Sequence, residues 1–286
     1  MLLTVVIVLV LVLVVVVALV LVLARQAKAE RQARAPEERW TRLLTEGHPP
    51  LRMAQLMMRR LPSPPRCKLC FNPFGGIPGR IMRMAGFRPS RKNPNFCSRC
   101  CDMLPAGGAE VHIGVLFADV RGSTTLAEGK SAAEFAELLN RFYATATDVL
   151  VRRDAVVDKL IGDEVMALFV PGFAGEDYLR QAGEAAADLL RAVGYGTDSQ
   201  PWLDVGVGVN SGVAYVGNVG GTVMDFTALG DTVNVAARLQ SRAASGELIL
   251  AEEVQAACED LFPDGESRTL ALKGREEPVT AFASRV

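Results

Sequence analysis

The stretch Lys159-Leu160-Ile161-Gly162-Asp163 stands between two apolar runs, Val156-Val157 before it and residues 165–169 after it. Two runs rich in β-branched residues that are joined by a Gly-Asp corner predict a β-hairpin. Gly-Asp pairs are also common in solvated turns. Here, however, a cation precedes the corner and a carboxylate stands at it. Because apolar strands fix the position of a hairpin tip, this polar pair is well placed to reach a ligand.

Residues 1–24 contain no charge and consist almost entirely of Val, Leu and Ile. A helix of about 20 apolar residues crosses a bilayer, so this run predicts a single transmembrane helix. A cleaved signal peptide is the alternative interpretation. The run lacks a basic n-region, exceeds the length of a signal-peptide core and ends without a small-x-small cleavage site. A retained N-terminal anchor is therefore the expectation.

Charge is distributed unevenly behind this run. Residues 25–105 hold 17 Lys/Arg against 5 Asp/Glu, whereas residues 106–286 hold 14 against 27. A basic excess directly after an apolar span places the following chain in the cytoplasm, with its basic residues facing anionic headgroups. The expectation is a single-pass plasma-membrane protein with a cytoplasmic body. No nucleic-acid partner is expected, because an acidic body binds nucleic acid poorly.

Residues 25–65 predict a basic juxtamembrane helix that ends near Gly47, followed by a Pro-rich linker. Residues 51–61 fit a short amphipathic helix that either lies on the bilayer or packs on a partner. This region separates the predicted anchor from everything that follows.

Residues 66–105 form a Cys-rich segment with two C-x-x-C pairs, the spacing that lets thiolates share one tetrahedral ion. The paired residues are Cys67, Cys70, Cys97 and Cys100, with Cys101 as an alternative fourth ligand. Disulfides are rare in a reducing compartment, and the Gly-, Pro- and Arg-rich loop between the pairs has little means of folding without a metal or cross-link. The segment therefore predicts a bound metal, zinc first and an iron–sulfur cluster as the rival. Cys258 is expected to be ordinary core.

Residues 106–286 alternate strand-like and helical patterns, which predicts an α/β sandwich with mixed strands around one core. Ser131-x-x-Glu134 is a capping box at the start of a long helix. Gly206 and Gly208 interrupt a Val-rich strand and predict that backbone or ligand approaches closely there. The remaining expected elements are strands at 113–117, 203–209, 213–219, 247–250, 268–272 and 279–283, a turn at 210–212, and helices at 178–193 and 232–241, the latter N-capped by Asp231.

Three polar groups in this body suit phosphate chemistry. Asp119 and Asp163 each end a strand, and two converging carboxylates can hold a pair of Mg²⁺ ions. The loop 120–125 offers backbone N–H groups and hydroxyls from Gly122, Ser123 and Thr124 as a phosphate cradle.

Asn234 and Arg238 lie i, i+4 on one helix face. They could stabilise charge on a phosphorus centre, although exposed helix pairs of this kind are common. Lys159 and Thr227 suit reading the edge of a base.

Five runs, in this order and spacing, carry a resemblance to a known family. They are Leu116-Phe117-Ala118-Asp119-Val120-Arg121-Gly122-Ser123-Thr124, Lys159-Leu160-Ile161-Gly162-Asp163, Gly208-Val209-Asn210-Ser211-Gly212, Phe226-Thr227-Ala228-Leu229-Gly230-Asp231-Thr232-Val233-Asn234-Val235-Ala236-Ala237-Arg238 and Leu272-Lys273-Gly274. They resemble the catalytic domain of class III nucleotide cyclases over residues 110–284. The resemblance implies a ferredoxin-like α+β fold and conversion of ATP to cyclic AMP and pyrophosphate.

The resemblance also implies a role for each matching residue. Asp119 and Asp163 correspond to the metal aspartates, with the Val120 carbonyl as a further ligand, for two Mg²⁺ or Mn²⁺ ions per site. Lys159 corresponds to the base-reading lysine that favours adenine. The transition-state pair corresponds to Asn234 and Arg238.

In this family the active site lies between two cyclase domains, so a homodimer with the complete set would build two sites. One chain would give the aspartates, and the other Lys159, Thr227, Asn234 and Arg238. Thr227 stands where many members carry Asp. That variant resembles the subgroup of bicarbonate-responsive adenylate cyclases, which raises the hypothesis of bicarbonate stimulation.

Other interpretations remain beside this one. A catalytically silent cyclase fold could act as a dimerising or nucleotide-sensing module coupled to a metal- or redox-sensing Cys cluster, although no metal Asp, Asn or Arg is missing. Guanylate cyclase is less favoured, since Lys159 stands where a guanine reader should be acidic. Diguanylate cyclase is excluded by the absence of a Gly-Gly-Asp-Glu-Phe run.

Overall fold

The computed structural model describes residues 36–47, 65–91, 93–102, 104–198, 200–221, 224–271 and 277–286 of the 286-residue chain. The predicted transmembrane run 1–24, most of the 25–65 linker and the 272–274 run lie outside these ranges. Within them, no helix combines the length and the apolar character needed to cross a membrane.

The body is built on one eight-stranded mixed sheet with the order β2-β3-β1-β4-β6-β8-β7, and β5 pairs with β4 outside this path. The strands are β1 Gly107–Val120, β2 Val156–Ile161, β3 Glu164–Phe169, β4 Val205–Gly220, β5 Met224–Leu229, β6 Glu247–Ala251, β7 Glu266–Leu270 and β8 Val279–Arg285. The pairing of β4 with β6 is parallel, and the other pairings are antiparallel. The predicted α/β sandwich with mixed strands is confirmed.

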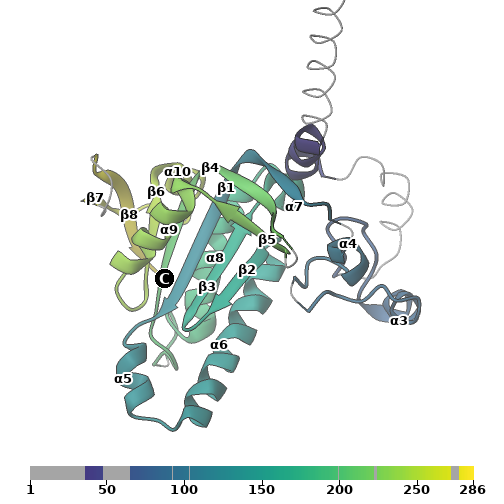
Figure 1. Ribbon diagram of the computed structural model, residues 1–286. Helices are drawn as coiled ribbons and strands as arrows, with labels where there is room; N and C mark the ends of the chain where they lie inside the picture. The colour runs from purple at the N-terminus through teal and green to yellow at the C-terminus, as the bar shows by residue number, and fades with distance from the viewer. Residues whose placement is uncertain are drawn as a thin grey trace, which may run out of the picture.

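The described helices are α3 Gly76–Met84, α4 Ser98–Asp102, α5 Ser123–Glu128, α6 Ala132–Arg152, α7 Pro171–Ala174, α8 Tyr178–Val193, α9 Asp231–Arg242 and α10 Glu252–Ala257, and residues 36–46 are also helical. Helices α6 and α8 cover one face of this sheet and α9 lies on the other, whereas α3 and α4 stand away from it (Figure 1). The predicted capping box of α6 is confirmed: the Glu134 N–H donates to the Ser131 hydroxyl, and the Glu134 carboxylate accepts from the Ser131 N–H at 2.9 Å.

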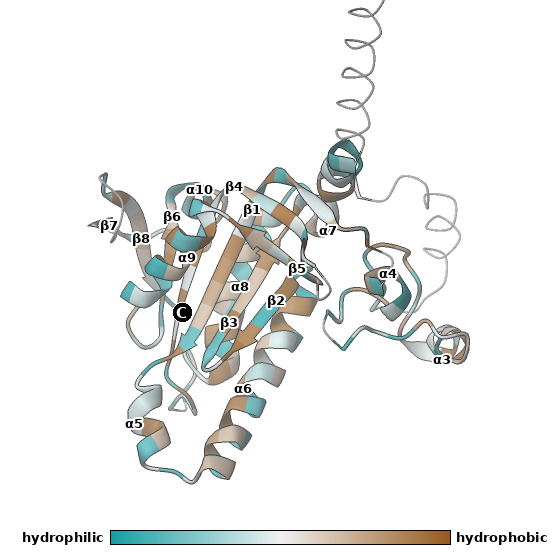
Figure 2. Cartoon of the chain, in the orientation of Figure 1, coloured by the Kyte–Doolittle hydropathy of each residue, from teal (hydrophilic) through white to brown (hydrophobic). Residues whose placement is uncertain are grey.

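Alternate side chains of the central strands point into two separate hydrophobic cores, one on each face of the sheet. Leu116 and Ala118 of β1 pack with α6 and α8 on one face, where Cys258 is also fully buried, as predicted. Val115 and Phe117 point to the other face, where β5 and the Cys-rich segment cover them. Figure 2 shows the apolar strands in brown between these layers. Since consecutive side chains of a strand face opposite ways, β1 is apolar along most of its length.

The predicted turn at 210–212 is wrong. β4 is one continuous strand, and β1 pairs with it in unbroken register from Gly107↔Asn218 to Val120↔Val205. Gly212 accommodates this path with a positive φ of 149°, which glycine adopts without a Cβ clash. The N-cap expected at Asp231 is also one residue off. Gly230 is the N-cap, and Asp231 is the first residue of α9.

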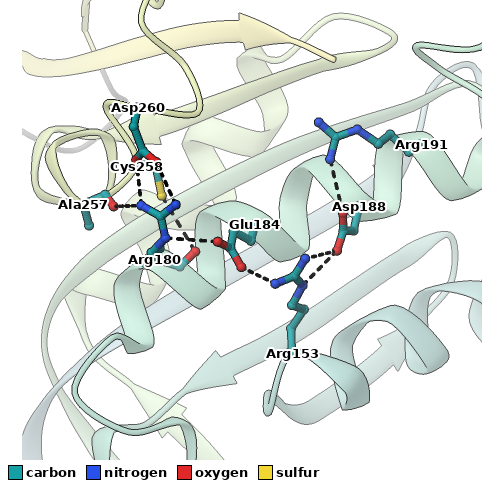
Figure 3. Close-up of polar contacts among 8 residues, drawn as sticks. All are labelled: Arg153, Arg180, Glu184, Asp188, Arg191, Ala257, Cys258 and Asp260. Carbon is teal, nitrogen blue, oxygen red and sulfur yellow. Dashed lines mark hydrogen bonds and ion pairs between the residues drawn. The ribbon is translucent and has the colours of Figure 1, made fainter.

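A ladder of ion pairs fixes α8 to its neighbours (Figure 3). Arg180 donates to both carboxylate oxygens of Asp260, at 2.6 and 2.8 Å, and its Nε donates to Glu184 at 3.0 Å. One turn further on, Arg153 bonds to Glu184 and, at 2.6 and 2.8 Å, to Asp188. Bidentate guanidinium–carboxylate pairs add direction as well as energy. The ladder joins the end of α6 and the segment after α10 to successive turns of α8.

Gly206 and Gly208 confirm the expected close approach in the Val-rich strand. A Cβ at Gly208 would lie 2.1 Å from the backbone nitrogen of Gln240 on α9, and one at Gly206 would lie 2.5 Å from Nε of Arg121. The missing side chains therefore let α9 and the Arg121 guanidinium rest directly on β4.

Replacing Gly208 by alanine is expected to lower the free energy of unfolding by about 1–3 kcal/mol, because either β4 or α9 must move. Gly129→Ala is the matched control, since its Cβ would meet nothing closer than the Thr125 carbonyl at 3.6 Å. Denaturant unfolding followed by circular dichroism measures both variants. Equal stability of Gly208→Ala and the parent chain would contradict the close packing.

Candidate active site

Asp119 and Asp163 meet at one end of the sheet. Asp119 lies next to the end of β1 and pairs in register with Glu164 of β3. Asp163 occupies the two-residue turn between β2 and β3, whose register Ile161↔Glu164 confirms the predicted hairpin. The Val120 N–H donates to the Asp163 carbonyl at 3.2 Å. This bond fastens the hairpin tip to the end of β1, so the two carboxylates share one corner.

Three carboxylates concentrate negative charge at this corner. Burial, followed by the negative charge of Asp163, raises the pKa of Asp119 above its ordinary value, while the Arg121 guanidinium opposes this shift. Burial also raises the pKa of Glu164, with the charges of Asp119 and Asp163 adding to the effect. Like charges that converge in a half-buried place repel one another, and a divalent cation relieves that repulsion. Carboxylate and carbonyl oxygens suit Mg²⁺ or Mn²⁺, so the donor set fits the ions expected from the sequence.

Arg121 belongs to this corner, although the sequence analysis did not single it out. Its Nη1 lies 3.7 Å from the Asp119 carboxylate, and its Nη2 donates to the Gln240 carbonyl at 2.5 Å. Its backbone N–H donates to the Asp204 carbonyl at 2.8 Å. Arg121 thereby connects the corner that holds Asp119 and Asp163 to α9. Only Gly206, which makes room for the guanidinium, gave an indirect signal in the sequence.

The predicted phosphate loop adjoins the same corner. Gly122 takes a left-handed conformation, with φ 68° and ψ 24°, and is the N-cap of the short helix α5. Ser123 is the first residue of that helix and Thr124 the second. The chain therefore turns sharply just after Asp119 and Val120.

Lys159 and Thr227 meet in a second polar group. Lys159 Nζ donates to the Thr227 hydroxyl at 2.5 Å and to the Asp158 carboxylate at 2.9 Å, and the Thr227 hydroxyl donates to the other Asp158 oxygen at 2.7 Å. β5 is paired with β4 but crosses the face of the sheet (Figure 1), which brings Thr227 to β2. In the described part of the chain, no hydrogen bond or ion pair connects this group to Asp119 or Asp163.

Asp158 is the second residue that sequence reasoning missed. Its side chain is 0% exposed, whereas that of Lys159 is 32% exposed. Burial raises the pKa of Asp158, while hydrogen bonds from Thr227 and Lys159 lower it. The strand register shifts between Val157 and Lys159, and such a bulge re-aims neighbouring side chains. In a regular strand, consecutive side chains alternate between the two faces of the sheet, so Asp158 and Lys159 would point to opposite faces. The bulge brings both side chains to one site.

Asn234 and Arg238 lie one turn apart on α9. Asn234 is exposed and Arg238 is half-buried, and the Arg238 side chain forms no hydrogen bond or ion pair with another described residue. The helix is held against β4 over Gly208. Its fixed position presents an amide and a guanidinium from a rigid support.

Four cysteines of the Cys-rich segment form a compact sulfur cluster, with all Sγ atoms within 4.8 Å of one another. They are Cys67, Cys70, Cys97 and Cys100. Cys101, the alternative fourth ligand, is not among them. Four sulfurs at 2.3 Å from one tetrahedral ion would lie about 3.8 Å apart, and the Cys70 and Cys97 sulfurs lie 3.8 Å apart.

Backbone geometry around the cluster also favours metal binding. The N–H of Cys97 donates to Sγ of Cys67 at 3.2 Å, and the N–H of Cys100 donates to Sγ of Cys97 at 3.4 Å. Hydrogen bonding to Cys100 lowers the pKa of both Cys67 and Cys97, whereas the pKa of Cys100 is raised by its hydrogen bonds within the cluster and that of Cys70 is also raised. Thiolates are the form of cysteine that binds metal. The cluster therefore could hold a single tetrahedral ion.

The Cys-rich segment docks onto the strands that carry the Lys159 group. Asn95 donates to the Ala155 carbonyl just before β2, and Lys68 pairs with Asp154. Phe96 is fully buried, with its ring 6.1 Å from that of Phe226 on β5 and edge-on to it. The Cys-rich segment thus contacts β5 and the residues just before β2.

Comparison with known proteins identifies the class of domain that this fold represents. The chain belongs to the family of adenylate and guanylate cyclase catalytic domains, whose family model matches residues 109–284. The adenylyl cyclase CyaB from P. aeruginosa is 28% identical with a TM-score of 0.54, covering 61% of this chain and 93% of that one. The guanylyl cyclase Cya2 is 27% identical with a TM-score of 0.56, covering 62% of this chain and 93% of that one.

A sequence relative extends the comparison. The uncharacterized protein Rv1318c of Mycobacterium tuberculosis (strain ATCC 25618 / H37Rv) is 34% identical over 183 residues, which are 60% of this chain and 32% of that protein. The chain therefore spans about a third of the length of the curated relatives it matches. An adenylyl cyclase and a guanylyl cyclase are similar to this chain to nearly the same degree. The comparisons therefore assign a nucleotide cyclase domain but do not distinguish ATP from GTP as its substrate.

Metal analysis of purified variants tests the sulfur cluster. By mass spectrometry we expect one bound metal ion in the parent chain and loss of most of it in Cys97→Ser, because one of four sulfur ligands is lost. Cys101→Ser and Cys258→Ser are the matched controls and should keep it. Metal loss in Cys101→Ser but not in a Cys100→Ser variant would show that the ligand set is wrong.

Proposed function

We propose that this chain is a membrane-anchored adenylate cyclase that converts ATP to 3′,5′-cyclic AMP and pyrophosphate at a homodimer interface. Its span would lie at residues 1–24 in the plasma membrane, with the catalytic body in the cytoplasm, as the charge asymmetry indicates. The observation that carries the proposal is the Lys159–Thr227–Asp158 group in a chain that also keeps the complete set Asp119, Asp163, Asn234 and Arg238.

The adenine preference follows from hydrogen-bond polarity. Two of the three Lys159 protons face Asp158 and Thr227, which leaves one for a ring nitrogen that accepts, as N1 of adenine does. The Thr227 hydroxyl donates its proton to Asp158. One of its lone pairs remains free to accept a hydrogen bond from the exocyclic amine of adenine. Guanine presents an oxygen in place of that amine and an N–H in place of the accepting nitrogen. Both contacts would then be mismatched.

Homodimerisation is supported by the separation of the two polar groups and by exposed apolar side chains beside them. Leu160 and Ile161 at the hairpin are 42% and 58% exposed, and Val213 and Leu229 on β4 and β5 are 57% and 49% exposed. Large apolar side chains gathered on exposed strands indicate a protein interface. In the proposed dimer one protomer supplies the aspartates and its partner the remaining site residues.

Each site residue has a defined task in the proposed reaction. Asp119, Asp163 and the Val120 carbonyl would hold two Mg²⁺ or Mn²⁺ ions. Such ions neutralise a triphosphate and lower the pKa of a hydroxyl. The 3′-hydroxyl of the ribose would lose its proton to water. Its oxygen would form a bond to the α-phosphorus, and the bond from that phosphorus to pyrophosphate would break, so that pyrophosphate leaves. Asn234 and Arg238 donate to the oxygens on which charge increases.

The decisive experiment is an assay of the full-length protein in detergent, given ATP or GTP with Mn²⁺. Cyclic AMP from ATP, with little cyclic GMP from GTP, is the expected result. Cyclic GMP as the main product would overturn the base assignment. No product from either nucleotide would favour the silent, nucleotide-sensing module.

A mixing experiment tests the shared site. Asp119→Ala and Arg238→Ala are each expected to abolish turnover, because a metal ligand or a transition-state donor is lost. A mixture of the two chains should regain activity, since one site of each heterodimer then has only parental residues. The rate of cyclic AMP formation measures this. A mixture as inactive as its components would exclude sharing between protomers.

Asp158→Asn tests the buried carboxylate that positions Lys159 and Thr227. Losing a charge-assisted hydrogen bond costs about 1.5–3 kcal/mol, so kcat/KM for ATP should fall by about 10- to 100-fold. The change should appear mainly in KM, with weaker discrimination against GTP. Asp148→Asn, on the exposed side of α6, is the control and should leave both unchanged. A pure loss of kcat with unaltered base preference would argue against this role.

Bicarbonate stimulation belongs to the proposal because Thr227 replaces the more frequent Asp. Rates of cyclic AMP formation with and without bicarbonate should differ at the same pH and ionic strength. Chloride at equal concentration is the control. Equal rates would remove bicarbonate from the proposal.

We also assign zinc to the sulfur cluster, because a single tetrahedral ion fits sulfurs 3.8 Å apart. The contacts of Asn95 and Phe96 with β2 and β5 favour a second function, in which metal or redox change at the cluster regulates nucleotide binding. Cyclase rates in Cys97→Ser, measured beside its metal content, test this. Unchanged rates after complete metal loss would count against regulation.

A further inference from the structure

Helix α3 carries an apolar stripe that the described fold leaves uncovered. Ile77, Ile81 and Met84 are 74%, 60% and 90% exposed. They occupy positions i, i+4 and i+7, which lie along one face of a helix. Figure 2 shows apolar colour on this outer helix although it stands away from the sheet. Three large, exposed apolar side chains aligned along one face of a nine-residue helix are unusual for a surface that contacts only water.

The opposite face of α3 is fixed to the Cys-rich segment. Gly79 is buried, and a Cβ there would lie 2.4 Å from the Phe74 carbonyl. Arg83 Nη2 donates to that same carbonyl at 3.2 Å. The helix cannot roll without losing these contacts. Its apolar stripe is therefore held outward.

The surroundings of the stripe are strongly basic. Residues 66–101 contain eight Lys/Arg and no Asp or Glu. Arg80 and Arg83 lie on α3 itself, Arg88 and Arg91 follow it, and all four are exposed. A hollow beside the stripe is lined by Arg80 and Arg83 together with residues 74–77. Arginines bury their stems beside apolar groups while their heads reach anionic ones, so this surface is complementary to a negatively charged, apolar-backed partner.

We propose that α3 lies flat on the inner surface of an anionic lipid bilayer, with Ile77, Ile81 and Met84 inserted and the surrounding arginines on lipid phosphates. An amphipathic helix with basic flanks binds in this way, and stable attachment takes two signals. The uncharged run 1–24, which the proposed function treats as a transmembrane span, would be the second attachment to the membrane. Because it tethers the chain to the bilayer, it would raise the effective concentration of lipid near α3. The surface would hold the Cys-rich segment, and the strands docked to it, at the membrane.

Lipid quenching measures this contact in the full-length protein. Ile81→Trp is reconstituted into vesicles of phosphatidylcholine with phosphatidylglycerol, with and without brominated acyl chains. The new indole should emit at shorter wavelength than in water and lose intensity to the brominated lipid. Leu261→Trp is the control, because Leu261 is exposed at 41% on the cyclase body and should show neither change. Emission of the parent chain is subtracted in each case.

Charge dependence separates this partner from others. Quenching should weaken in pure phosphatidylcholine and after adding Arg80→Glu, whereas Arg285→Glu on β8 should not alter it. A blue-shifted but unquenched indole would mean that protein, such as a second copy of the chain, covers the stripe. That result, or an indole that behaves as in water, would overturn the proposal. Neither the emission wavelength nor the quenching depends on turnover. The membrane proposal is therefore tested independently of the cyclase assay.

Discussion

The close packing of α9 on β4 is the contact on which the positions of the candidate site residues depend. Gly208 lets the backbone of Gln240 reach the strand, and Gly206 leaves room for the Arg121 guanidinium. Arg121 then bonds to the Gln240 carbonyl and faces Asp119. The two glycines thus set the distance between the helix that carries Asn234 and Arg238 and the strand that carries Asp119. A side chain at either glycine would push α9, and with it Asn234 and Arg238, away from β4. In the proposed dimer this would disturb the half-site that each chain offers to its partner.

The Lys159 group illustrates a second constraint, the cost of burying charge. An isolated carboxylate in the position of Asp158 would lose its hydration and take up a proton. Two donors, Lys159 and Thr227, replace the missing water. Such a network is more restrictive than an exposed pair, because removing any member leaves another polar group buried without a partner. The same hydrogen bonds orient Lys159, which in the proposed function is the residue that binds the base.

Local patterns in the sequence were sufficient for the hairpin around Gly162, the capping box at Ser131, the core position of Cys258 and the reason for Gly208. Each depends on a few neighbouring residues. The bulge at Asp158 could not be predicted, because its cause is the pairing with β3. The continuity of β4 was missed for a related reason: Asn210-Ser211-Gly212 has the composition of a turn, and only its fourteen-residue ladder with β1 keeps it extended. Long-range pairing overrode local preference in both cases.

The choice between Cys100 and Cys101 likewise needed three dimensions, since two adjacent cysteines both follow Cys97 at a usable spacing. The short helix α4 settles it by directing Cys100 into the cluster. Four thiolates around one divalent ion carry fewer negative charges than the eight positive charges of residues 66–101, so the segment stays cationic after metal binding. One of its ends touches β2 and β5, and α3 stands at the other (Figure 1). In the proposed zinc-bound form, this segment would connect its outer helix to the strands that hold Asp158 and Thr227, so a displacement of α3 would reach them.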